Sequence, residues 1–172
     1  EAFGYVTSGS TAYYGFAIGR WSATRPVNFE AFATTVPRIE SPVYARSISN
    51  LADSPGAVTV AALNVASPYT HEYYSSEGPT NGPGGTASGG FVKPDIAAYA
   101  RVSTMSYGAG AFFGTSAATP HVAGLAGLLY SYLGTGTSNS TIRARIENNC
   151  DNVGTWVAKG RINCRRAITN GP

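Results

Sequence analysis

The feature that most constrains this chain is a segment of small residues that runs into an apolar stretch, at 114–133. It begins Gly-Thr-Ser, continues with alanines and a Pro-His pair, and then places glycines among leucines. A stretch that is apolar on nearly all sides predicts a buried helix rather than a surface helix. We expect Ser116 at the N-terminus of this helix and Pro120 in or near its first turn, where a missing N–H costs little.

The expected position of Ser116 suits a nucleophile. The first N–H groups of a helix have no acceptor within the helix, and the helix dipole adds partial positive charge at this end. Negative charge that develops on an oxygen beside Ser116 is therefore stabilised.

Residues 114–124 resemble the nucleophile motif of the subtilisin-like serine proteases (subtilases), Gly-Thr-Ser, small residues, then Pro-His-Val-Ala-Gly. Two other blocks agree in order and spacing. Residues 54–62 resemble the family's strand toward the substrate-binding edge, and residues 74–79 with 93–98 resemble its Ser-Ser-x-Gly-Pro and Lys-Pro-Asp-Ile-x-Ala-Pro blocks. The chain departs from the pattern at Tyr99-Ala100, where the family usually has Pro-Gly.

The resemblance extends over about residues 50–168 and implies an α/β fold, the C-terminal half of a subtilisin-like parallel-sheet domain. It also implies a reaction on a polypeptide substrate, in which Ser116 attacks a peptide carbonyl, an upstream His accepts the proton and an upstream Asp orients that His. The Ser116 backbone N–H supplies half of the oxyanion hole with support from Thr115, and an upstream Asn supplies the rest. This chemistry requires no metal and no cofactor.

Three residues before Thr115 are candidates for substrate binding. Phe112, Phe113 and Gly114 directly precede the expected nucleophile, on the side where the leaving group of the cleaved bond would lie. For the two phenylalanines, packing is the alternative role.

The upstream partners of Ser116 are not recognisable in this chain. None of the family's motifs around its Asp, His and oxyanion-hole Asn occurs before Ser54. Of the two histidines, His121 follows Ser116 by five residues, about 140° around the helix and about 7.5 Å along it, so it cannot face the hydroxyl. We expect His121 to pack within the fold and His71 to lie in a loop.

The chain therefore reads as an excised piece of a longer protease. Its start at Glu1 shows no signal peptide, and a serine without its base is a weak nucleophile. We expect the missing N-terminal half of the catalytic domain as a partner and no activity from the chain alone.

Two regions of different pattern divide the chain. Residues 1–50 carry period-two alternation at 14–21, 27–34 and 43–48, which predicts a small β-rich, sandwich-like segment. This segment is similar to an insertion that some multidomain subtilases carry. Residues 51–172 are expected to form the C-terminal part of the subtilase catalytic domain.

Residues 51–172 have an α/β pattern. The continuous apolar run at 57–63 predicts a buried parallel strand, and the helix after Ser116 should end at Gly134. The remaining expected elements are strands at 95–99 and 101–105, a helix at 140–148 with Ile142 and Ile146 inward, and a hairpin at 157–164, similar to one in the family, before a last helix.

Composition argues against several classes of protein. Charged residues make up only 12% of the chain and the net charge is +3, with scattered basic residues, which disfavours nucleic acid as a partner. No apolar run reaches transmembrane length. A weakly charged chain rich in Gly, Tyr, Ser and Thr is common among secreted proteins, and we expect an extracellular location.

Two details stay open on sequence alone. Cys150 and Cys164 enclose residues 151–163 and either form a disulfide, worth roughly 3 kcal/mol, or remain separate thiols. Asn139-Ser140-Thr141 matches a glycosylation sequon and also suits a helix start.

Two functions from different classes are compatible with these residues. The first is a serine endopeptidase that acts through an acyl-enzyme on Ser116. The second is a catalytically dead subtilase-like scaffold that serves as a binding or adhesion module. The intact Gly114-Thr115-Ser116 favours the peptidase, and the upstream Asp and His would decide.

Overall fold

The computed structural model describes residues 43–171 together with residues 19, 22 and 24. The strands predicted at 14–21 and 27–34 therefore lie outside the described residues, apart from Gly19. The strand predicted at 43–48 is wrong, because this stretch is a turn with Arg46 at φ 62°. Its backbone bonds to Glu77 and Gly78 instead of to a neighbouring strand, with Ser47 N donating to Glu77 O at 3.0 Å.

A two-stranded parallel sheet forms the centre of the described fold. Strand β1 (Val60–Asn64) pairs with β2 (Ile96–Ala100) in a register that runs from Val60↔Ile96 to Asn64↔Ala100. Leu63 and Ile96 are fully buried, as a continuous apolar run in a strand covered on both faces requires. The buried parallel strand predicted at 57–63 and the short strand predicted at 95–99 are both confirmed, with boundaries that differ by a few residues.

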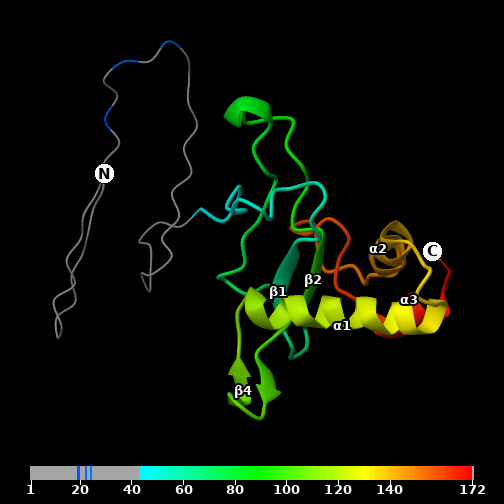
Figure 1. Ribbon diagram of the computed structural model, residues 1–172. Coiled ribbons are helices and arrows are strands. Elements are labelled where there is room, and N and C mark those ends of the chain that lie inside the picture. The colour runs from blue at the N-terminus through cyan, green and yellow to red at the C-terminus, as the bar shows by residue number, and fades with distance from the viewer. Residues whose placement is uncertain (1–18, 20–21, 23, 25–42, 172) are drawn as a thin grey trace.

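Helix α1 (Thr115–Leu133) lies across this sheet (Figure 1) and begins where the sequence predicts. It ends at Gly134, whose φ of 99° and N–H bond to Tyr130 O at 3.0 Å are typical of a helix C-cap. The burial on nearly all sides that the sequence predicts is present on one side of α1 among the described residues, and the other side is exposed, as expected where the missing N-terminal half would cover it. One face packs on the sheet, and no described residue covers the opposite face. The buried face consists of Ala117, Ala118, Val122, Leu125 and Leu129, and the exposed face includes Ala123, Gly124, Gly127 and Leu128.

Two shorter helices complete the core at the C-terminal end. Helix α2 (Asn139–Glu147) is capped by Ser138, which accepts a bond from Thr141 N at 3.2 Å, and it buries Ile142 and Ile146 as predicted. Helix α3 (Cys164–Thr169) is capped by Asn163 in the same way. No helix among the described residues is both long enough and apolar enough to cross a membrane.

The hairpin predicted at 157–164 is wrong. Instead of two paired strands, single bridges join Arg161 to Ala97 and to Asp151. Gly160, at φ 112°, precedes them and has no room for a side chain, because a Cβ there would lie 2.2 Å from Asp151 O. The segment therefore docks onto the end of the sheet rather than folding back on itself.

An antiparallel hairpin that projects from the body carries the chain into α1 (Figure 1). It consists of β3 (Val102–Thr104), which was predicted, and β4 (Gly108–Phe112), which was not. We call residues 102–112 the hairpin arm. On the side of the sheet opposite the arm, the Gly-rich loop at residues 78–90 carries the short 3-10 helix η1 (Pro83–Gly85).

Candidate active site

Ser116 is the second residue of α1 and is exposed. Its hydroxyl and its backbone N–H have no hydrogen-bond partner among the described residues. An N–H in the first turn of a helix is free of intrahelical acceptors, so this N–H is available to an oxygen that approaches the Ser116 hydroxyl. The side chain and one potential oxyanion donor thus come from the same residue.

The turn before Ser116 depends on a glycine. Gly114 is the N-cap of α1 with φ 93° and ψ 166°, a conformation that side chains rarely adopt. Its N–H donates to the Tyr74 hydroxyl at 3.0 Å. Burial raises the pKa of Tyr74, although the Gly114 bond acts in the opposite direction, so the phenol stays neutral well above pH 7. The sequence showed Tyr74 only as part of a motif and gave no sign of this contact across 40 residues.

Pro120 lies in the second turn of α1, as its sixth residue, and not in the first turn. Because proline has no N–H, the carbonyl of Ser116 lacks its usual helical partner. The carbonyls on either side accept side-chain bonds: Thr119 Oγ1 donates to Thr115 O at 2.9 Å, and His121 Nδ1 lies 2.8 Å from Ala117 O. Side chains therefore reinforce the helix around the proline.

Both histidines have partners other than Ser116. The His121 imidazole bonds to its own helix and meets the ring of Tyr99 edge-on at 5.8 Å. His71 stacks on Trp156 with 4.1 Å between ring centres, and its Nδ1 lies 3.3 Å from the Glu77 carboxylate. Burial lowers the pKa of His71 in spite of that carboxylate. Among the described residues, no histidine contacts the Ser116 hydroxyl.

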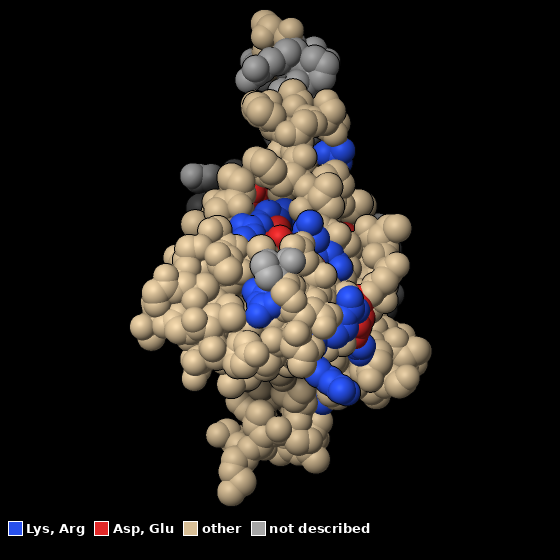
Figure 2. Space-filling model, turned by 90° about the vertical axis from the view of Figure 1, so that its right-hand side faces the viewer, with Lys and Arg blue, Asp and Glu red and all other residues tan. Residues whose placement is uncertain are grey.

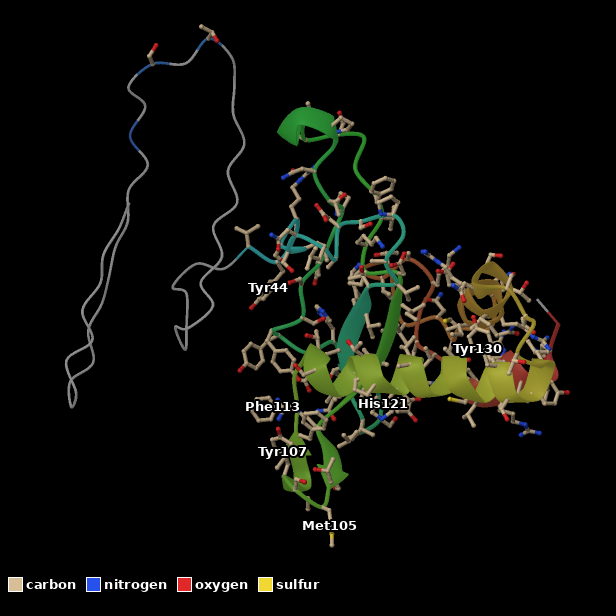
Figure 3. All side chains as sticks on the ribbon, in the orientation of Figure 1. Tyr44, Met105, Tyr107, Phe113, His121 and Tyr130 are labelled. Carbon is tan, nitrogen blue, oxygen red and sulfur yellow. The ribbon has the colours of Figure 1, made fainter. Side chains whose placement is uncertain are left out.

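The two phenylalanines before Gly114 differ in environment. Phe113 is 59% exposed and lies beside the N-terminal end of α1 (Figure 3), with its ring 6.3 Å from that of Tyr74. Phe112 is partly buried against the core and stacks on Tyr107 at 4.7 Å. Phe113 is therefore free to contact a ligand near Ser116, whereas Phe112 already has packing partners.

An open hollow of about 390 Å³ adjoins the first turns of α1. Thr115 and Thr119 form one wall, and Val58 and Ser75 are among the residues that line the rest. The Thr115 hydroxyl has no partner among the described residues, so a group that enters the hollow can reach it.

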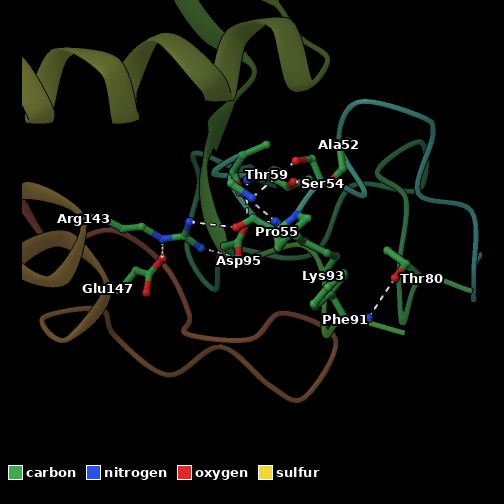
Figure 4. A network of polar contacts seen from close by, with 12 residues as sticks. Ala52, Ser54, Pro55, Thr59, Thr80, Phe91, Lys93, Asp95, Arg143 and Glu147 are labelled. Carbon is green, nitrogen blue, oxygen red and sulfur yellow. Dashed lines mark hydrogen bonds and ion pairs between the residues drawn. The ribbon is translucent and has the colours of Figure 1, made fainter. Parts of the chain in front are cut away.

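A network of charged side chains, among them the buried Lys93 and Asp95, lies at the end of the sheet where β1 and β2 begin (Figure 4). The Asp95 carboxylate accepts bonds from Lys93 Nζ at 2.7 Å, Thr59 N at 2.6 Å and Arg143 Nη2 at 3.1 Å. The Lys93 side chain is 2% exposed, and Arg143 Nε also bonds to Glu147 at 2.5 Å. All these charges are paired, so the network joins β2, α2 and the turn before β1 and leaves no free acid or base.

A second charged cluster surrounds Asp151. Its carboxylate accepts bonds from Arg161 at 2.6 Å, Arg166 at 3.0 Å and Asn163 at 3.1 Å. The Arg161 guanidinium also lies 3.9 Å from the ring centre of Tyr69. Within the part of the chain that the structure describes, no group of three or more His, Cys, Asp or Glu side chains could hold a metal ion.

The two cysteines are separate thiols. Cys150 Sγ donates to Ile146 O at 3.3 Å, and burial, with the carboxylates of Glu147 and Asp151, raises its pKa to about 11. Cys164 is exposed at the first position of α3.

The sequence of this chain is similar to sequences of known proteins. The sequence pattern of the Subtilase family matches residues 35–166. Over 73 residues the chain is 49% identical to thermitase from Thermoactinomyces vulgaris, a match that covers 41% of this chain and 24% of thermitase. Over 59 residues it is 49% identical to a thermophilic serine proteinase from Bacillus sp. (strain AK1), covering 33% of this chain and 14% of that proteinase. The matches thus span about a quarter or less of these curated relatives.

Proposed function

The chain belongs to the subtilase family, and on that premise we propose that it is the part of a serine endopeptidase that carries the nucleophile, Ser116. One observation carries this proposal: Ser116 is exposed at the second position of α1, with its hydroxyl and N–H unpartnered among the described residues, directly after the glycine-dependent turn at Gly114. An N–H at this position of a helix has no acceptor within the helix, so it is free to stabilise an oxyanion beside the Ser116 hydroxyl.

The proposed reaction is acyl transfer from a peptide bond. Ser116 Oγ attacks the carbonyl carbon while its proton passes to a histidine, and the carbonyl oxygen becomes an oxyanion held by the Ser116 N–H. The C–N bond then breaks, the histidine returns the proton to the leaving amine, and water hydrolyses the ester on Ser116. Thr115 supports the oxyanion, and Phe113 with Gly114 contacts the leaving-group side.

We further propose that the histidine and its aspartate come from a part of the protein other than the described residues. His71 and His121 are held by Trp156 and Glu77, and by Ala117 and Tyr99, respectively. We also propose that the protein is secreted, because its weakly charged composition is common among extracellular proteins.

The test uses the full-length protein, upstream residues included, with a chromogenic peptide. Ser116→Ala should lower kcat/KM by about four orders of magnitude or more without changing the melting temperature. The matched control is Ser131→Ala, which removes an exposed hydroxyl from the same helix and should leave the rate unchanged. The 172-residue chain alone should show no turnover.

Two results would contradict the proposal. Turnover that survives Ser116→Ala would assign the nucleophile elsewhere. A full-length protein that folds, binds peptides and never cleaves them would favour the dead scaffold.

A further inference from the structure

The hairpin arm and the residues at its base display a set of large apolar side chains that share one property, exposure to solvent. Met105 at the tip is fully exposed, and Tyr107, Phe113 and Tyr73 are 62%, 59% and 69% exposed. Figure 3 shows Tyr107 and Phe113 on one side of the arm, with Met105 at its far end. The aromatic strip, as we name it, comprises these four exposed side chains and two partly buried rings that contact them, Tyr74 and Phe112.

Ring contacts join most of the strip into pairs. Tyr107 stacks on Phe112 with 4.7 Å between ring centres, Tyr74 lies 6.3 Å from Phe113, and Tyr73 meets Tyr74 edge-on at 5.2 Å. Single exposed aromatic residues are common on protein surfaces, but a joined series of them marks an interaction site. Aromatic side chains also lose little entropy on binding, because they have only two rotatable bonds.

Both ends of the arm are held by the same short segment. At the start, Arg101 makes a bidentate pair with Glu72, at 2.5 and 3.1 Å, and the Glu72 side chain is 5% exposed. At the end, the Gly114 N–H bonds to the Tyr74 hydroxyl at 3.0 Å. The arm is therefore fixed to the body two residues before Ser116, and its position relative to that hydroxyl is fixed as well.

The surroundings of the strip select for uncharged ligands. No Asp, Glu, Lys or Arg occurs between Arg101 and Arg143, and Arg101 itself is paired. A charged segment laid along the arm would lose hydration without gaining an opposite charge. An apolar segment would gain by covering the exposed rings.

We propose that the aromatic strip binds an uncharged, apolar stretch of the polypeptide substrate beyond the bond that Ser116 cleaves, with Met105 and Tyr107 as its distal contacts. This inference rests on the proposed function, since the strip is continuous with Ser116 through residues 113–115. The five residues of β4 span about 17 Å at about 3.4 Å per residue. An extended substrate therefore needs about five residues past the cleaved bond to reach the tip of the arm.

The experiment measures binding rather than turnover. Fluorescence anisotropy compares two labelled, uncharged peptides on the full-length protein, upstream residues included, that carries Ser116→Ala. One peptide has two residues after the cleavage position, and the other has six, with Phe and Leu at the fifth and sixth. The long peptide should bind roughly tenfold more tightly, about 1.4 kcal/mol. Met105→Ser with Tyr107→Ser should remove that difference.

The matched control is Leu128→Ser with Tyr132→Ser, which removes two side chains of α1 that are 56% and 62% exposed. It should keep the preference for the long peptide. If the arm variant loses its fold by circular dichroism, Met105→Ser alone repeats the test at a fully exposed position with a smaller effect.

Three outcomes overturn the inference. The first is equal binding of the two peptides, and the second is a preference that the α1 control loses and the arm variant keeps. The third is that the protein binds neither peptide but forms a dimer in sedimentation, which the arm variant abolishes. Binding does not require cleavage, so loss of turnover in the full-length protein with an intact peptide preference contradicts the proposed function and leaves this inference standing.

Discussion

Two parts of the described chain differ in their use of charge. The clusters around Asp95 and Asp151 combine acidic and basic residues in close pairs, and Figure 2 shows Lys and Arg with interspersed Asp and Glu across the middle of one face. The stretch 102–142, which contains the arm, Ser116 and α1, has no Asp, Glu, Lys or Arg. Charge holds the C-terminal elements together, whereas backbone conformation and neutral bonds position Ser116.

This difference explains why Ser116 is positioned but not activated. A hydroxyl becomes a strong nucleophile only when a base accepts its proton, and the described neighbours of Ser116 include none. Each charged side chain of the two clusters already has an ion-pair partner of opposite charge. The ion pairs among the described residues therefore stabilise the fold, and substitutions in them should change the free energy of unfolding rather than the chemistry at Ser116.

The largest effect on stability is expected from Lys93→Met. The substitution removes an ammonium that is 2% exposed and leaves the Asp95 carboxylate, 10% exposed, with one cation fewer. Breaking such a buried pair should lower the free energy of unfolding by about 3 kcal/mol in urea denaturation. Lys159→Met, at an exposed lysine, is the control and should change it by less than about 0.5 kcal/mol. Equal effects of the two would mean that the Asp95 cluster does not stabilise the fold.

A smaller effect is expected from Asp151→Asn. Burial acts to raise the pKa of Asp151, but hydrogen bonds from Arg161, Asn163 and Arg166 outweigh it and hold the pKa below the usual value. The unfolded chain then binds the proton more readily, so this stability is present above about pH 4 and is lost as pH falls through the lowered pKa. The variant should lose about 1–2 kcal/mol at pH 7.

The measurement is the melting temperature of both proteins between pH 7 and pH 2.5. The difference between them should shrink as the pH falls below 4. A difference that stays constant over this range would show that Asp151 does not titrate differently in the folded state.

The third substitution tests the uncharged region around Ser116 and should lower the free energy of unfolding by about 1 kcal/mol. Tyr74→Phe removes the acceptor of the Gly114 N–H while keeping the ring. Hydrogen exchange at the Gly114 amide should become faster, because its bond is lost. Tyr73→Phe, at a residue 69% exposed, is the control and should leave that amide unchanged. An unchanged exchange rate in Tyr74→Phe would show that the hydroxyl does not hold the turn.

The sequence predicted those elements of the fold that depend on residues close together in the chain, and missed features that depend on contacts between distant residues. The apolar run of β1 and the small-residue helix start at Gly114 are local patterns, and both elements formed where expected. Strand β4 was missed because Gly-Ala-Gly-Ala lacks the branched and aromatic residues that favour strands. The run at 43–48 alternates like a strand, but backbone hydrogen bonds to Glu77 and Gly78 hold it in a turn.

In the candidate site, too, the sequence predicted local features but not contacts between residues far apart in the chain. The position of Ser116 at the start of α1 followed from its own neighbours in sequence, and so did the offset that separates it from His121. The Tyr74–Gly114 bond and the Glu72–Arg101 pair join residues far apart in the chain, and no local periodicity signals such contacts. The same holds for the exposed face of α1, since apolar character alone does not say what covers a helix.

The smallest effect on stability is expected from Cys164→Ser. This thiol is exposed and free, so the free energy of unfolding should change by less than about 0.5 kcal/mol, and a reductant should not change the melting temperature. Cys150 lies beside the Asp151 cluster, where burial and then the carboxylates of Glu147 and Asp151 raise its pKa to about 11. At pH 8 only about one Cys150 in a thousand is then a thiolate, the reactive form. Mass spectrometry after iodoacetamide should therefore find Cys164 modified well before Cys150. Suppose instead that neither thiol reacts until a reductant is added, and that the reductant lowers the free energy of unfolding by roughly 3 kcal/mol. The two cysteines would then form a disulfide, and the description of Cys150 as a free, neutral thiol would be wrong.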